Sequence, residues 1–125
     1  MLRIALILVL MTPSWAWAEN YLCLPTKITG FHFVNDKWET GVMDTGDLKY
    51  IVSIDNKSVS EFGEAEPIHT DCGMVSDIML CTKGFGEFNM GIETLRYMRT
   101  LPYADYLLGA TGGTPNIEIG TCSKF

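Results

Sequence analysis

The chain has 125 residues and a net charge of −6, with 15 acidic against 9 basic residues. A chain of this length accommodates one domain, because single domains commonly contain about 100–150 residues. Its Lys and Arg residues are scattered among more numerous acidic ones, so it repels phosphate backbones and anionic lipid headgroups. The composition therefore argues against a nucleic-acid partner and against binding to membrane surfaces.

The first 18 residues have the pattern of a cleavable secretory signal peptide. Arg3 supplies a positive charge, residues 4–11 are an unbroken apolar run, and residues 16–18 (Ala-Trp-Ala) form a small-residue cleavage site. The apolar run is too short for a membrane span, which needs about 20 residues. We therefore expect a periplasmic or secreted protein, with one domain at residues 19–125 and no membrane insertion after cleavage.

The four cysteines are Cys23, Cys72, Cys81 and Cys122. An even number of cysteines in a short exported chain indicates disulfide bonds. Three pairings are open, and we favour Cys23–Cys122 with Cys72–Cys81. The first bond would tie the two ends of the domain together, and the second would staple a hairpin. In the chain-entropy description they would stabilise the fold by about 4.7 and about 2.7 kcal/mol.

Turn-forming residues recur along the rest of the chain at intervals of roughly 8–12 residues, which is typical of small all-β domains. They lie at residues 35–36, 44–47, 55–57, 83–84 and 112–113. Between these turns we predict strands at residues 28–34, 48–54, 78–82 and 117–119, because these runs are rich in β-branched and aromatic residues.

Residues 92–101 fit two kinds of element. Their alternation fits a strand, and the three-residue spacing of Ile92, Leu95 and Met98 fits a helix. The strand is favoured because the neighbouring segments are predicted strands. The sequence therefore predicts a mainly β fold, a small antiparallel meander closed or nearly closed into a barrel or sandwich and held by two disulfides.

Residues 86–89 (Gly-Glu-Phe-Asn), 94–97 (Thr-Leu-Arg-Tyr) and 114–122 (Thr-Pro-Asn-Ile-Glu-Ile-Gly-Thr-Cys), together with Cys23 and residues 38–52, carry a resemblance. Over most of residues 19–125 the chain resembles a family of small exported proteins of Gram-negative bacteria. This resemblance implies a periplasmic or secreted location and brings no assigned activity. In architecture the chain is also similar to the periplasmic inhibitors of C-type lysozyme, although their serine-containing inhibitory loop is not evident here.

No catalytic constellation emerges from the sequence, so no catalytic residue is predicted. A strand position between two phenylalanines is expected to turn His32 toward solvent. His69 with Cys72 and Cys81 could supply metal ligands, but an oxidising compartment favours a disulfide, and we predict no metal and no other cofactor. An acidic cluster is expected to be a solvated loop; its members are Glu61, Glu64 and Glu66.

Aromatic residues provide the candidate binding surface, because Tyr, Trp and Arg are common at binding hot spots. The candidate binding residues are Trp38, Tyr97, Arg99 and Tyr103, with Tyr106 as a further member of the patch. On a strand, Tyr97 and Arg99 would share one face while Arg96 points the other way. Two alternatives stay open: that these rings fill the core, and that Arg99 pairs with an acidic residue of its own chain.

These features together predict an exported, non-enzymatic binding protein of the cell envelope that is inhibitor-like and has another envelope protein as its partner. Three alternatives remain. They are a β-barrel that holds a small apolar ligand, a small hydrolase that uses a histidine, and a structural part of an envelope assembly.

Overall fold

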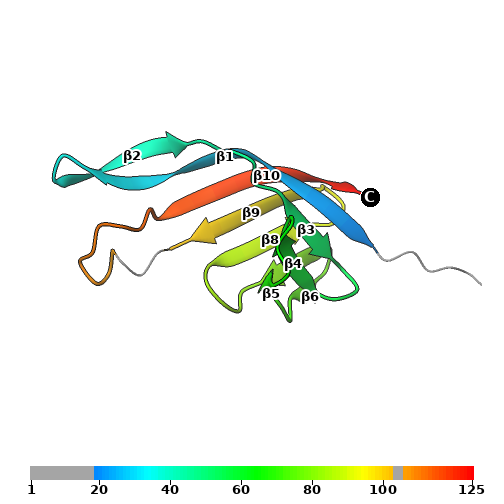
Figure 1. Cartoon of the computed structure of the whole chain (residues 1–125). Coiled ribbons are helices and arrows are strands. Elements are labelled where there is room, and N and C mark those ends of the chain that lie inside the picture. The colour runs from blue at the N-terminus through cyan, green and yellow to red at the C-terminus, as the bar shows by residue number, and fades with distance from the viewer. Residues whose placement is uncertain (1–18, 103–105) are drawn as a thin grey trace, which may run out of the picture.

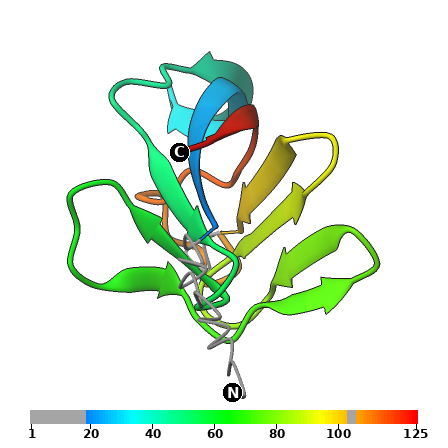
Figure 2. The same ribbon diagram turned by 90° about the vertical axis from the view of Figure 1, so that its right-hand side faces the viewer.

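The computed structural model describes residues 19–102 and 106–125. The described residues form one antiparallel sheet that curls into a half-barrel (Figure 1, Figure 2), which confirms the predicted mainly β fold. The strands are β1 (Asn20–Val34), β2 (Lys37–Met43), β3 (Tyr50–Ser53), β4 (Ser58–Glu61), β5 (Pro67–His69), β6 (Gly73–Val75), β7 (Ile78–Cys81), β8 (Glu87–Gly91), β9 (Arg96–Leu101) and β10 (Asn116–Lys124). No helix in these two ranges is long and apolar enough to cross a bilayer. The predicted signal peptide and Tyr103 lie outside the described residues.

Strand β1 is the spine of the sheet, whose order is β5-β4-β3-β1-β10-β9-β8-β7-β6. One edge of β1 pairs with β10, and the other edge pairs first with β3 and then with β2. The register shifts between Pro25 and Lys27, as expected at a proline, which cannot donate a ladder hydrogen bond. Beyond this bulge, residues 28–43 form a hairpin that projects past the half-barrel (Figure 1), and we call it the arm.

Turns form at predicted positions, and their residues have the conformations and hydrogen bonds that such turns need. Asn35 and Asp36 connect β1 to β2 with φ angles of 52° and 61°, the left-handed conformation of a two-residue hairpin turn. The Gly46 N–H donates to the Asp44 carboxylate over 2.9 Å in the next turn. The Leu95 N–H donates to the Gly91 carbonyl over 2.9 Å, so residues 92–95 form a turn and the predicted strand begins only at Arg96.

Both predicted disulfides are present, and every cysteine is bonded. Cys23 and Cys122 lie directly opposite each other on β1 and β10, with 4.0 Å between their Cα atoms. The Cα atoms of Cys72 and Cys81 are 4.4 Å apart. Two such bonds indicate an oxidising, extracytoplasmic environment. Around them lies the core on the inner face of the half-barrel, formed by Tyr21, Tyr50, Val52, Val59, Met79, Phe88, Met90 and Tyr97.

Candidate functional site

The predicted binding residues Tyr97 and Arg99 lie on β9 and share one face, while Arg96 points to the other side and is exposed. Their common face is the inside of the half-barrel, where Tyr97 is only 3% exposed. Of the two alternatives left open by the sequence, a surface patch or a core position, Tyr97 takes the core position, so it does not form a surface pair with Arg99.

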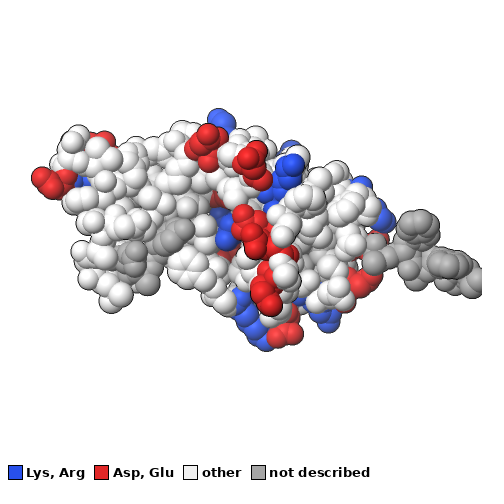
Figure 3. Space-filling model, viewed as in Figure 1, with Lys and Arg blue, Asp and Glu red and all other residues white. Residues whose placement is uncertain are grey.

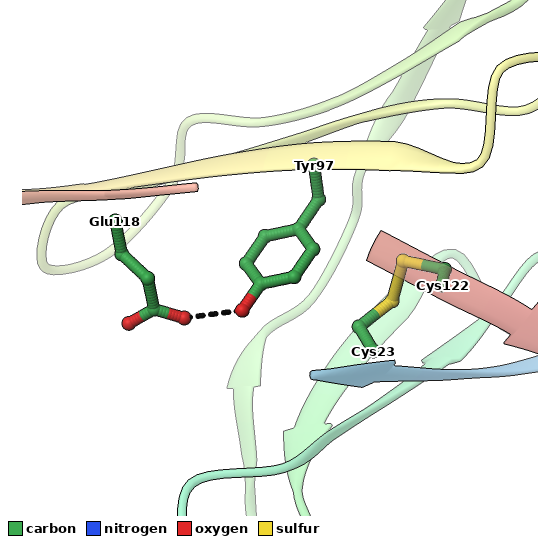
Figure 4. The surroundings of a disulfide bond; sticks show 4 residues. All are labelled: Cys23, Tyr97, Glu118 and Cys122. Carbon is green, nitrogen blue, oxygen red and sulfur yellow. Dashed lines mark hydrogen bonds between the residues drawn. A yellow bond between two sulfur atoms is a disulfide. The ribbon is translucent and has the colours of Figure 1, made fainter. Parts of the chain in front are cut away.

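Tyr97 and Arg99 instead belong to a buried polar cluster centred on Glu118 of β10. The Tyr97 hydroxyl donates to Glu118 Oε1 over 2.5 Å (Figure 4), and the Tyr50 hydroxyl donates to Glu118 Oε2 over 3.0 Å. Arg99 Nη1 donates to the Tyr50 hydroxyl over 2.8 Å, and its guanidinium carbon lies 5.2 Å from the centre of the Tyr50 ring. Each carboxylate oxygen of Glu118 thus accepts a hydrogen bond. A buried carboxylate needs such partners, and Glu118 is only 2% exposed.

The two tyrosines of this cluster hold their protons firmly. Burial, opposed by Arg99 and reinforced by Glu118, raises the pKa of Tyr50 to about 12. Burial and the hydrogen bond to Glu118 also raise the pKa of Tyr97 well above its ordinary value. Both hydroxyl groups therefore stay protonated at neutral pH and remain donors to Glu118.

Neighbouring residues hold the Tyr97 ring in place. Gly120 lies directly opposite Tyr97 in the β9–β10 ladder, where a Cβ atom would overlap the ring and the Leu24 carbonyl oxygen. Phe88 stacks on Tyr97 with 4.9 Å between ring centres, and the Cys23–Cys122 disulfide lies nearby (Figure 4). These contacts enclose the Tyr97 ring.

The remaining described binding candidate, Trp38, lies on the arm, beside an open apolar groove. The groove consists of two adjoining cavities of about 400 and about 430 Å³ that share Phe31, Pro102 and Pro115. The first cavity is completed by Thr29, Gly30, Thr40, Thr100, Leu101, Asn116 and Ile117, and the second by Trp38, Tyr106 and Leu107. No charged residue lines either cavity among the described residues.

Contacts between the arm and the segment before β10 form this groove. The Phe31 N–H donates to the Pro115 carbonyl over 2.9 Å, which continues the β1–β10 pairing by one step. Trp38 meets Phe33, its cross-strand partner, at 5.5 Å between ring centres, and meets Tyr106 at 5.3 Å. Part of the predicted aromatic patch thus exists, because Trp38 and Tyr106 are in contact.

The histidines serve packing in this structure. His32 is half-buried, with its ring against the backbone of Gly41 on β2, so it is less exposed than the sequence predicts. His69 is 2% exposed, and its Nδ1 atom lies 3.0 Å from the Lys83 carbonyl oxygen. Within residues 19–102 and 106–125, no group of three His, Cys, Asp or Glu side chains is placed to hold a metal ion.

Most of the acidic cluster follows its prediction. Glu64 and Glu66 are exposed between β4 and β5. Glu61 differs, because it is the last residue of β4 and is half-buried.

Comparisons with known proteins supply no information about this site, so its interpretation rests on its own geometry. A scan against protein-family models and searches of curated proteins and of solved structures found no match to this chain.

Proposed function

We propose that the chain is an exported, non-enzymatic binding protein of the periplasm or the extracellular space, and that its groove holds apolar side chains of a basic partner protein. Residues 1–18 are its signal peptide in this proposal. The observation that carries it is the apolar groove, lined by Phe31, Trp38, Tyr106 and Leu107 with two prolines.

The lining of the groove suits capture of apolar groups. Phe31 remains 49% exposed and Leu107 83% exposed, so both have apolar surface left to bury. Burial of apolar surface contributes about 25 cal/mol per Å². Prolines lose little side-chain freedom when a ligand binds, and the Trp38 ring is already held by two aromatic neighbours. Two adjoining cavities fit two side chains of one extended segment.

Charge favours a basic partner. The chain carries a net charge of −6. Figure 3 shows Asp and Glu side chains in a band across the middle of one face, while the arm is largely uncharged apart from its tip. Such a field accelerates encounter with a positively charged protein, and the uncharged groove then supplies affinity through apolar burial.

A tryptophan-based assay tests the groove directly. Trp38 is the only tryptophan outside residues 1–18, so its fluorescence reports on the groove in the exported protein, with Trp38→Phe as the blank. The probe is a short peptide that alternates lysine and leucine. Comparison peptides replace each leucine by glycine or each lysine by glutamate. We expect a saturable change with the lysine–leucine peptide and much weaker changes with the other two.

Matched variants show whether the peptide occupies the groove. Phe31→Ala should weaken binding at least about tenfold, the usual scale for an interface hot spot. Phe62→Ala removes an equally apolar ring that is 60% exposed and belongs to neither cavity of the groove, and it should leave binding unchanged. Equal binding of the glycine peptide, or equal effects of both substitutions, would contradict the proposal.

Export has its own test. Intact-mass measurement on protein recovered from the periplasm or the medium should give a chain that begins at Glu19. A recovered species that retains residues 4–11 would overturn the signal-peptide assignment.

A further inference from the structure

A further cavity, which shares Leu101 and Asn116 with the groove but has charged residues in its wall, opens beside the buried polar cluster on the inner side of the sheet. We call it the mouth pocket; its volume is about 380 Å³. It is lined by Ile28, Met43, Asp44, Leu48, Glu61, Arg99, Leu101, Asn116 and Glu118. Charged groups of both signs therefore line one small space whose remaining wall is largely apolar.

The cation of this pocket makes no direct ion pair with any described residue. Arg99 lies opposite Glu118 in the β9–β10 ladder, and the Tyr50 hydroxyl, which accepts from Arg99 and donates to Glu118, bridges the two groups. Within the described residues, the guanidinium makes one hydrogen bond, to the Tyr50 hydroxyl, and no ion pair. The Nε atom is buried and has no hydrogen-bond partner among the described residues, so the guanidinium keeps N–H groups that could donate to the planar oxygens of a carboxylate.

Two further carboxylates line the same pocket with acceptor positions unused. Glu61 makes no side-chain hydrogen bond and no ion pair with any described residue. Asp44 uses one oxygen for the Gly46 N–H, which leaves its second oxygen open. Neither carboxylate pairs with Arg99 although all three residues line the pocket. A ligand that carries both charges would satisfy both sets of groups at once.

We propose that the mouth pocket binds an amino-acid zwitterion with an apolar side chain. Arg99 takes the carboxylate of the ligand, Glu61 and Asp44 face its ammonium group, and Met43, Leu48 and Leu101 cover its side chain. A cavity of about 380 Å³ lies at the small end of ligand pockets, as a single amino acid requires. This site does not depend on the partner proposed for the groove.

Titration calorimetry on the exported protein tests the ligand class with L-leucine as the probe. Leucinamide lacks the carboxylate, 4-methylpentanoate lacks the ammonium group, and glycine lacks the side chain. We expect leucine to bind and each of the three analogues to bind at least about tenfold more weakly, as loss of a charged or apolar anchor implies. No heat with millimolar leucine, or equal affinity for either singly charged analogue, would overturn the proposal.

Two substitutions localise the site. Glu61→Gln removes one pocket carboxylate and should weaken leucine binding several-fold. Glu64→Gln removes the same charge from an exposed position that is not among the residues lining the pocket, and it should have no effect. Equal effects of the two substitutions would mean that net charge alone affects leucine binding, and would contradict the proposed site. Arg99→Lys keeps the charge without the planar fork and should weaken leucine binding more than leucinamide binding.

The two sites can fail independently. Phe31→Ala should leave leucine binding intact, and Glu61→Gln should leave the Trp38 response to the lysine–leucine peptide intact. Loss of only one response therefore identifies which proposal is wrong.

Discussion

Aromatic rings have different fates in the half-barrel and in the arm. In the half-barrel, Tyr50, Phe88 and Tyr97 pack against one another and are at most 3% exposed. In the arm, Phe31 is 49% exposed although it too lies on a strand. The curled sheet encloses its inner face, whereas a two-stranded hairpin has no second layer to cover its rings. Enclosure therefore makes one set of rings a core, whereas the ring of Phe31 on the arm keeps about half of its surface exposed.

The first prediction concerns the removal of each disulfide bond. Replacing Cys23 and Cys122 by alanine should cost up to about 4.7 kcal/mol of unfolding free energy, because that bond closes a loop with a sequence separation of 99. The Cys72 and Cys81 pair, with a separation of 9, should cost about 2.7 kcal/mol. Urea denaturation of the two double variants measures both values. Equal losses would show that loop length does not set the stabilisation.

The second prediction compares one phenylalanine from each region. Phe88→Ala should cost about 3–5 kcal/mol, because it leaves a cavity among buried rings. Phe31→Ala should cost less than about 1.5 kcal/mol, since the ring is half-exposed. Thermal and urea unfolding of the two variants give both values. Similar losses would mean that the arm belongs to the core.

The third prediction concerns the polar centre of the half-barrel. Glu118→Ala removes the acceptor of two buried hydroxyl groups and should cost about 2–6 kcal/mol, because each unsatisfied group costs about 1–3 kcal/mol. Glu64→Ala, at an exposed position, should stay within about 0.5 kcal/mol of the parent. A neutral result at Glu118 would show that water enters the cluster.

The fourth prediction is a loss of stability in alkali. The folded protein keeps the Tyr50 proton up to a pKa of about 12, while an unfolded tyrosine loses it near its ordinary value of 10.0. The folded state thus binds more protons in this window, so the stabilisation is complete below pH 10 and falls as pH rises toward 12. Between pH 10 and 11 the loss from Tyr50 is about 1 kcal/mol, because the unfolded tyrosine is only half ionised at pH 10. Urea midpoints measured across this range should fall; constant midpoints would contradict the assignment.

Local chemistry made part of this fold predictable from the sequence. The Asn35-Asp36 turn follows from residues that tolerate positive φ, and the cysteine pairing observed is the one favoured among the three that the sequence left open. Strands β5 and β6 were not predicted, because their three residues are too few to show alternation. Strand β2 was also missed, since its sequence combines charged residues with a glycine.

The polar cluster could not be predicted, because the sequence does not show which face of a strand is enclosed. In β10, alternation alone would turn Ile117 and Ile119 inward and Glu118 outward. The structure has the reverse: both isoleucines are 49% exposed and Glu118 is 2% exposed. The reason lies on other strands, where Tyr50 and Tyr97 supply two donors for the carboxylate. The grouping of Tyr97 with Arg99 on one face was correct, and of the two open interpretations of Tyr97 the core position is the one observed.

The Cys23–Cys122 bond also determines how the protein responds to proteases. It encloses nearly the whole described chain, so a single cut anywhere between these cysteines leaves two pieces that remain covalently joined. A cut beside the exposed Leu107 or Leu108 would open the groove while β9 and β10 stay paired across the half-barrel. The nicked protein would run as one band without reductant and as two bands with it. A protease in the same compartment would therefore disrupt the groove without releasing a fragment.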